Sequence, residues 1–200
     1  LEIKQIPVLN DNYIYLIIDS ETKISACIDP ALSEPVINLL EKENLSLNYI
    51  LNTHHHFDHV GANLDLKKKY DCKIIGNKKD SSRIPGIDIK LDEGDFFEIG
   101  SSRCKVIEVS GHTNGHVAYY FKEENVIFCG DTLFSLGCGR LFEGTPQQMV
   151  QSLLKIRYLP DDTKIYCAHE YTLNNANFAL SLDPENRKLK EKIIDIQTKR

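Results

Sequence analysis

Residues 53–59 read Thr53-His54-His55-His56-Phe57-Asp58-His59 and directly follow the apolar run Tyr49-Ile50-Leu51. The segment holds four of the seven histidines of the chain, next to a carboxylate. Imidazole nitrogens and carboxylate oxygens bind divalent metals such as zinc, which need several ligands at about 2.0–2.2 Å. If the segment is extended, His54 and His56 point to one side and His55 to the other. If a helix begins near Asp58, Asp58 and His59 turn back toward the same spot, so this one segment predicts four metal ligands.

The pattern T-H-x-H-x-D-H of residues 53–59 resembles the signature of the metallo-β-lactamase superfamily of hydrolases. In that family the other ligands are a histidine, a bridging aspartate and a last histidine, each after its own strand. The chain offers them in the same order as His112 (in SGHT, 110–113), Asp131 (in CGDT, 129–132) and His169 (in CAHEY, 167–171). The resemblance implies an α/β (α+β) fold, the αββα sandwich of two mixed sheets flanked by helices.

The composition fits a globular protein with a core of its own. The chain has 200 residues, of which 42% are hydrophobic and 26% charged. It has no apolar run long enough for a membrane span, and its start lacks the pattern of a signal peptide. The net charge of −5 and pI near 5.8 argue against a nucleic-acid surface. We expect a cytoplasmic monomer that contacts neither nucleic acid nor membrane.

Six cysteines are scattered along the chain without a C-x-x-C pair. Several lie in apolar runs that read as strands, so we expect reduced thiols within the core. This pattern agrees with a cytoplasmic protein.

Alternating and helical patterns predict the order of the elements. Strands are expected at 3–9, 13–18, 24–28, 47–52, 72–75, 96–99, 103–109, 116–121, 126–129 and 164–167. A capped helix is expected from Ser33 to about Asn44, one helix from Asp58 to Tyr70, and a loop over 78–88. Thr145-Pro146-Gln147-Gln148 reads as a capping box that begins a helix to about Tyr158. Two last helices are expected, one that is broken at Asp183-Pro184 and one that runs from there to the end of the chain.

Two further segments narrow the resemblance. Residues 137–145 (GCGRLFEGT) and 167–175 (CAHEYTLNN) resemble the glyoxalase II family, the hydroxyacylglutathione hydrolases, and the likeness covers almost the whole chain. It implies one metal held by His54, His56 and His112, a second held by Asp58, His59 and His169, and Asp131 as the bridge. Asp29 matches a position that supports the ligands from behind. Arg140, Phe142 and Tyr171 match positions that contact the glutathione part of the substrate.

The resemblance also implies a reaction. It predicts a thioester hydrolase of methylglyoxal detoxification that splits S-D-lactoylglutathione into glutathione and D-lactate. A hydroxide that bridges the two metals, with Asp58 and Asp131 as the catalytic carboxylates, would attack the thioester carbonyl. The thiol has a pKa of about 8.5 and can leave as the thiolate without a strong acid. We expect two zinc ions, although such ligands also accept iron or manganese.

The C-terminal part departs from the family. Residues 1–172 are predicted to form the catalytic domain and 173–200 a helical segment shorter than the family usually has. Family members continue with basic residues that grip the glycine carboxylate of glutathione, and no basic residue of this segment matches them. The segment contains Arg187, Lys188, Lys190 and Lys192.

Four other interpretations stay open. A related hydrolase could act on a different thioester, and a persulfide dioxygenase would use one iron. A zinc β-lactamase commonly takes a cysteine near the bridging position and no histidine beside the motif aspartate, whereas this chain has Asp131 and His59 there. A catalytically silent metal-binding domain is the alternative that is not an enzyme.

Overall fold

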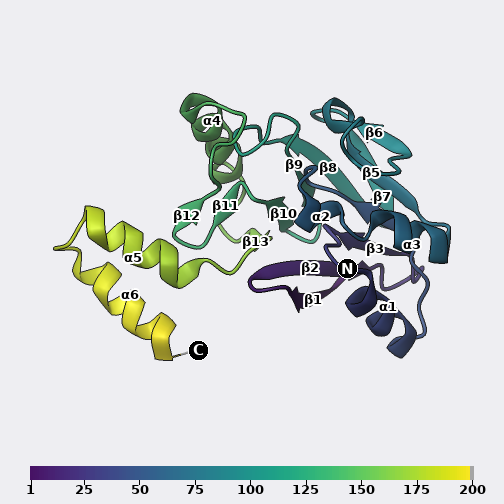
Figure 1. Cartoon of the computed structure of the whole chain (residues 1–200), viewed down its shortest axis with the longest axis horizontal. Coiled ribbons are helices and arrows are strands. Elements are labelled where there is room, and N and C mark those ends of the chain that lie inside the picture. The colour runs from purple at the N-terminus through teal and green to yellow at the C-terminus, as the bar shows by residue number, and fades with distance from the viewer. Residues whose placement is uncertain (199–200) are drawn as a thin grey trace.

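The computed structural model describes residues 1–198 as two β-sheets packed face to face, with helices on their outer sides (Figure 1). The N-terminal sheet has six strands, which lie side by side in chain order. They are β1 (Glu2–Val8), β2 (Asn12–Ile18), β3 (Ser25–Ile28), β4 (Tyr49–Leu51), β5 (Lys73–Asn77) and β6 (Ile89–Leu91). β1, β2 and β3 pair antiparallel, and β3 to β6 pair parallel. The sheet is therefore mixed, and the histidine-rich segment follows β4.

The second sheet has the order β13-β10-β9-β8-β7. Its strands are β7 (Phe96–Ile99), β8 (Ser102–Glu108), β9 (Val117–Phe121), β10 (Val126–Gly130) and β13 (Lys164–Cys167). β9 is antiparallel to β8 and to β10, whereas β10 and β13 are parallel. The chain therefore leaves β8, β10 and β13 at the same edge. The ribbon of β11 (Leu133–Phe134) and β12 (Gly137–Cys138) follows β10.

Three apolar clusters hold the four layers together. Leu16 of β2 faces α1 (Ser33–Lys42) and α3 (Asn63–Tyr70), while Tyr15 and Ile17 face the other sheet, because side chains alternate along a strand. Ile156 of α4 (Pro146–Arg157) packs on the outer face of the second sheet. The predicted αββα sandwich is confirmed.

The start of α4 is also as predicted. Thr145 Oγ1 accepts a hydrogen bond from Gln148 N (3.2 Å), and Gln148 Oε1 accepts one from Thr145 N (2.8 Å). This reciprocal pair is the capping box, with Pro146 at the first helical position.

Helices α5 (Thr172–Leu182) and α6 (Arg187–Thr198) project from one side of the sandwich (Figure 1). They pack on each other around a small apolar cluster of Ala176, Ile193 and Ile196. The expectation that the last helix runs to the end concerns residues 199–200, which lie outside the described part. The domain division between residues 172 and 173 stays a prediction.

The single helix expected from Asp58 to Tyr70 is wrong. The chain forms α2 (Phe57–Val60), turns at Gly61 and Ala62, and then begins α3. At this turn Gly61 passes so close to Ala31 that a Cβ would lie 2.7 Å from the Ala31 carbonyl oxygen. Tertiary packing of the turn therefore overrides the apolar pattern of the sequence.

Three smaller expectations also need correction. Ser33 does not cap α1, because Leu32 is the N-cap residue and makes no side-chain cap. Residues 78–88 contain a 3₁₀ turn, η1 (Lys78–Asp80). The next strand, β6, was not predicted, because its three residues, Ile-Lys-Leu, have no apolar run. Four of the cysteines are buried, but Cys138 is exposed and Cys167 half-buried.

Within residues 1–198, no helix combines the length and the apolar character that a membrane crossing requires.

Candidate metal centre

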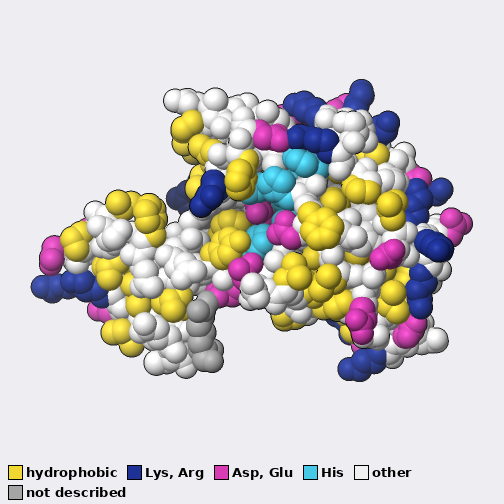
Figure 2. Space-filling view, in the orientation of Figure 1, with side chains coloured by type: hydrophobic (Ala, Val, Ile, Leu, Met, Phe, Trp, Pro, Cys, Tyr) yellow, Lys and Arg dark blue, Asp and Glu magenta, His cyan; other side chains and the backbone are white. Residues whose placement is uncertain are grey.

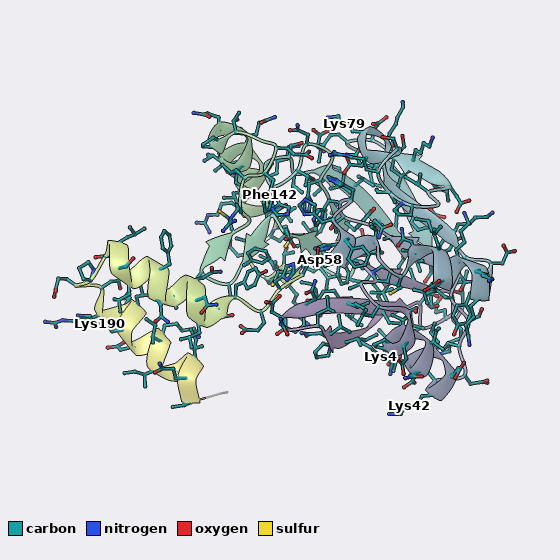
Figure 3. All side chains as sticks on the ribbon, in the orientation of Figure 1. Lys4, Lys42, Asp58, Lys79, Phe142 and Lys190 are labelled. Carbon is teal, nitrogen blue, oxygen red and sulfur yellow. The ribbon has the colours of Figure 1, made fainter. Side chains whose placement is uncertain are left out.

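Histidines and carboxylates gather in a hollow near the middle of one face of the molecule (Figure 2). The hollow belongs to a cavity of about 720 Å³ at the edge where β8, β10 and β13 end. Phe142 and Asp58, which line it, lie in the middle of the molecule, whereas the labelled lysines lie at its periphery (Figure 3). The predicted metal ligands come together here from four segments of the chain.

The first group consists of His54, His56 and His112. His56 Nδ1 lies 3.0 Å from both His54 Nε2 and His112 Nε2. Burial lowers the pKa of all three histidines, so they are neutral and carry free lone pairs. His55 turns the other way, with Nδ1 3.0 Å from Asp80 Oδ2, as the expected alternation predicts.

The second group consists of Asp58, His59 and His169. Asp58 Oδ2 lies 3.6 Å from His59 Nε2 and 3.4 Å from His169 Nε2. Burial opposes a charge on His59, but the neighbouring Asp131 and Asp29 outweigh it and raise its pKa to about 9. The pKa of His169 is raised in the same way, because the effect of Asp131 is larger than the opposite effect of burial. The carboxylates around these two histidines therefore favour a positive charge in this half of the centre.

Asp131 lies between the two groups and faces both. Its Oδ2 is 3.3 Å from His112 Nε2, whereas its Oδ1 is 3.4 Å from His59 Nε2 and 3.3 Å from His169 Nε2. Burial would raise the pKa of this carboxyl, but His59 and His169 hold it well below its usual range. One carboxylate thus offers one oxygen to each group.

Buried His116 positions Asp131 from behind. Its Nε2 accepts a hydrogen bond from Asp131 N at 3.1 Å, and its ring stacks on His54. Burial lowers the pKa of His116 to about 3, which keeps this nitrogen an acceptor. His116 is therefore a supporting residue and not a metal ligand.

The residues fit a pair of divalent metals. Three overlapping triads, His54–His56–His112, His54–His59–Asp131 and Asp58–His59–His169, each have donor atoms within 4.8 Å of one another. Ligands of one tetrahedral ion with bonds of about 2.0–2.1 Å lie about 3.3 Å apart, close to the distances above. His59 Nε2 and Asp131 Oδ1 are buried without a hydrogen bond, so the centre provides donor atoms that a cation would satisfy.

Asp29 lies behind the first segment. Its two oxygens accept hydrogen bonds from Thr53 N and Thr53 Oγ1, both at 2.7 Å, and its Oδ2 is 3.0 Å from His59 Nδ1. Asp29 has a φ of 51°, in the left-handed region that aspartate tolerates better than most residues. The carboxylate orients the ring of His59 so that Nε2 faces the centre.

Two supporting residues were missed in the sequence. Asp11 Oδ1 lies 2.9 Å from His169 Nδ1, and Asn12 Nδ2 donates to Asp58 Oδ2 at 2.9 Å. Asp11 lies in the turn between β1 and β2, and Asn12 is the first residue of β2. The polar run Asn10-Asp11-Asn12 was the available signal. The bridge between Asn12 and His169 and the hydrogen bond from Glu170 N to Asp11 O (2.8 Å) bring it to the centre.

The predicted substrate-contacting residues line the same cavity. The ring of Phe142 lies edge-on to His56 and His112, at centroid distances of 5.4 and 5.2 Å. Tyr171 stacks on His169 at 4.9 Å, and burial, with a smaller effect of Asp11, raises its pKa to about 12. Its hydroxyl stays protonated and can donate a hydrogen bond. Arg140 is exposed at the rim.

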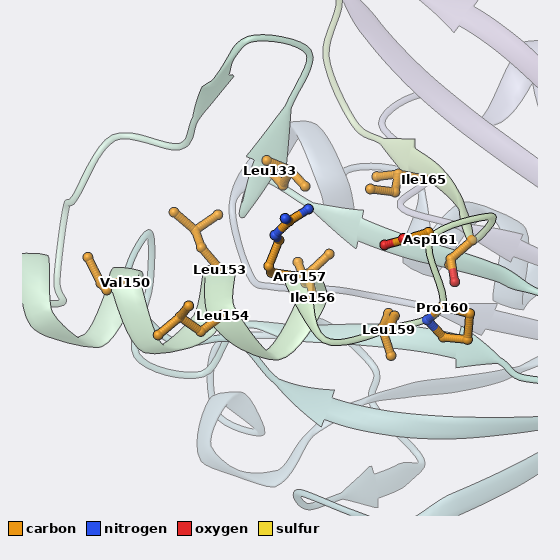
Figure 4. Close-up of a pocket in the computed structure, with 11 residues that line it drawn as sticks. Leu133, Val150, Leu153, Leu154, Ile156, Arg157, Leu159, Pro160, Asp161 and Ile165 are labelled. Atoms are coloured by element: carbon orange, nitrogen blue, oxygen red, sulfur yellow. The ribbon is translucent and has the colours of Figure 1, made fainter.

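A second cavity, of about 600 Å³, lies beside α4 and β13 (Figure 4). Its lining is mostly leucine and isoleucine side chains, with Arg157 and Asp161 as the charged members. It contains none of the histidines. The chemistry of the side chains therefore assigns the functional site to the first cavity.

Comparison with known proteins agrees with this geometry. Residues 10–169 match the family model described as "Metallo-beta-lactamase superfamily". A hydroxyacylglutathione hydrolase of Methylococcus capsulatus is 49% identical over 200 residues, covering 100% of this chain and 78% of that protein. One from Pelagibacter ubique is 51% identical over 193 residues, covering 96% of this chain and 81% of that protein.

Solved structures show the same fold. The B3 metallo-β-lactamase BLEG-1 aligns with a TM-score of 0.77 and 30% identity, over 84% of this chain and 92% of that one. TTHA1623 in a di-iron-bound form aligns with a TM-score of 0.71 and 28% identity, over 85% and 92%. Fold and motif thus define a protein of the metallo-β-lactamase superfamily. Within it, the chain belongs to the hydroxyacylglutathione hydrolase family of thioester hydrolases.

Proposed function

We propose that the chain binds two divalent metal ions and hydrolyses S-D-lactoylglutathione, or a closely related 2-hydroxyacylglutathione, to glutathione and the hydroxy acid. The main support for this proposal is the position of Asp131, whose two oxygens face different ligand groups. The curated relatives with about half of their residues identical are named hydroxyacylglutathione hydrolase, which supports the substrate.

His54, His56 and His112 would hold one metal, Asp58, His59 and His169 the other, and Asp131 would bridge them. The di-iron-bound form of the structurally similar TTHA1623 supports a centre of two ions. Zinc is the metal we expect, with iron or manganese as alternatives for the same ligands. Such a pair supplies polarisation of the substrate carbonyl and a lowered pKa of bound water.

The residues of the chain itself bind and orient the substrate. Arg140 at the rim would attract the anionic glutathione part, while Phe142 packs against it and Tyr171 donates a hydrogen bond. Asp58 and Asp131 would supply the two negative charges of the centre that face the metal ions. A thiolate leaving group with a pKa of about 8.5 needs no strong acid.

The proposal is tested by following the thioester absorbance of S-D-lactoylglutathione with the purified, metal-loaded chain. An Asp131→Ala variant should lose the activity. Arg140→Ala should raise KM for this substrate but leave that for a short acyl thioester without the peptide unchanged. If the chain cleaves only the short thioester, or a lactam, the glutathione assignment is wrong.

A further inference from the structure

The side chains of His55, Asp80, Arg83 and Glu143 form a closed ring beside the metal-binding segment. His55 Nδ1 donates to Asp80 Oδ2 at 3.0 Å, and Arg83 Nη2 donates to Asp80 Oδ1 at 2.5 Å. Arg83 also donates to both oxygens of Glu143, and His55 Nε2 lies 3.7 Å from Glu143 Oε1. Groups that carry or can carry positive charge thus alternate with carboxylates around the ring.

The ring does not touch the substrate cavity. None of its four members is among the residues that line that cavity, although His55 lies between His54 and His56 in sequence. Asp80 is fully buried, and both of its oxygens have partners. Arg83 spans two carboxylates with a planar fork of donors, a geometry that a lysine ammonium does not reproduce. The ring is therefore a connected set of hydrogen bonds around a buried carboxylate, and not a single ion pair on the surface.

Glu143 connects the ring to the segment that carries the substrate-facing residues. It follows Phe142 directly, and its Oε2 accepts a hydrogen bond from Asn114 N at 2.8 Å. The backbone of the same segment is bound on either side, because Phe142 N donates to His112 O (3.1 Å) and Gly144 N to Gly111 O (3.0 Å). Residues 140–143 are exposed, so the Glu143 side chain adds a third anchor to these two backbone hydrogen bonds.

We propose that Arg83 and Glu143 are positioning residues: they lock residues 139–144, and with them Arg140 and Phe142, onto the metal-binding motif through Asp80 and His55. Neither residue contacts substrate. Loss of the anchor loosens the segment at Glu143. Its backbone carbonyl at Arg140 still lies 2.7 Å from His112 Nδ1, and this contact helps to keep the metal ligands in place. Substrate binding should weaken, while the chemical step of bound substrate is little changed.

The first test reports the position of the segment without any activity. Arg140 is exposed, so trypsin can cleave between Arg140 and Leu141 when the segment opens. Mass spectrometry should find this cleavage several-fold faster in Glu143→Gln and in Arg83→Lys than in the wild type. The control is Glu41→Gln, which removes a carboxylate that pairs with Lys69 at 2.8 Å on the far helices. This control should be cleaved at the wild-type rate.

The second test rests on the proposed function and uses S-D-lactoylglutathione. Both variants should raise KM about tenfold, the equivalent of about 1.4 kcal/mol, with kcat and bound metal within about twofold of the wild type. A residue that only stabilises the fold would lower the melting temperature without this split. Arg83 lies in an irregular segment, so its lysine variant remains informative if Glu143→Gln does not fold.

The results of the two tests distinguish a failure of the positioning role from a failure of the proposed function. Unchanged cleavage at Arg140 in both variants overturns the positioning role, whatever the activity. A wild type that does not hydrolyse the substrate overturns the proposed function, while cleavage still decides the role of Arg83 and Glu143. Faster cleavage with an unchanged KM overturns the link between the anchor and substrate binding.

Discussion

Asp11 Oδ1 lies 2.9 Å from Nδ1 of His169, although 158 residues separate the two in the sequence. A carboxylate in this position fixes the ring and its tautomer, so that Nε2 faces the proposed metal. Asp11→Ala should lower the affinity for the metal bound by Asp58, His59 and His169 by about 10–100-fold. Competition with a chromophoric chelator measures this affinity.

Glu21→Gln is the matched control for Asp11→Ala, because Glu21 is an exposed carboxylate in the next turn of the same sheet. It should bind metal as the wild type does. Equal affinity in all three proteins would mean that Asp11 does not orient His169.

Gly130, directly before Asp131, has a φ of +49°, and a Cβ there would lie 2.7 Å from His116 Cε1. Gly130→Ala combines backbone strain with this clash and should cost on the order of 1–3 kcal/mol. It should also displace Asp131 and reduce metal binding. Urea unfolding and elemental analysis measure the two effects.

Gly94 separates the two causes. It has a φ of +84°, but a Cβ there would meet nothing within 4 Å. Gly94→Ala should cost only about 1 kcal/mol and leave metal binding intact. If both alanine variants bind metal equally well, close packing around Gly130 is not what places Asp131.

Buried Asp19 connects the turn after β2 to the turn after β7. It accepts hydrogen bonds from Ser101 Oγ (2.7 Å), Thr22 N (2.8 Å) and Thr22 Oγ1 (2.7 Å). These bonds favour the charged form and hold the pKa of Asp19 well below its ordinary value of 3.8. A lowered pKa stabilises the fold above that ordinary value, and the contribution is lost as the pH falls below it.

Asp19→Asn should therefore lower the free energy of unfolding by about 2 kcal/mol at pH 7. The difference from the wild type should shrink as the pH is lowered through 4 toward 2.5. Urea titrations of both proteins across this range make the measurement. A difference that is independent of pH would show that the charge of Asp19 does not contribute.

The Thr145 cap of α4 contributes to the covering of the second sheet. Thr145→Ala removes its hydrogen bond to Gln148 N and should cost about 1 kcal/mol, whereas Thr145→Ser should be close to neutral. Thermal unfolding measures both variants. Equal losses in the two variants would point to the methyl group of the threonine and not to its hydroxyl.

Local patterns predicted much of the fold and of the candidate site. Thr145 to Gln148 carry a cap whose partners lie within one turn, and the segment 53–59 brings four candidate ligands together by itself. Strands were recognised where the chain has an apolar run, including β4, which has only three residues. His112, Asp131 and His169 were found through the family resemblance, and the shared direction of β8, β10 and β13 explains why they meet.

The remaining features depend on contacts between distant segments. Asp11 and Asn12 read as an ordinary turn until β2 places them beside His169 and Asp58. Arg83 and Glu143 are 60 residues apart, and neither has a local pattern. The break between α2 and α3 follows from the packing of Gly61 against Ala31. The spacing of apolar residues in the sequence does not reveal this contact.

The bridging position of Asp131 is tested most directly by counting metals. The chain is stripped with a chelator, reloaded with zinc and desalted, and metal and protein are then determined on the same sample. We predict two ions per wild-type chain, and a loss of tightly bound metal together with hydrolysis of S-D-lactoylglutathione in Asp131→Ala. A wild type that hydrolyses this thioester fully with one ion per chain would contradict the account.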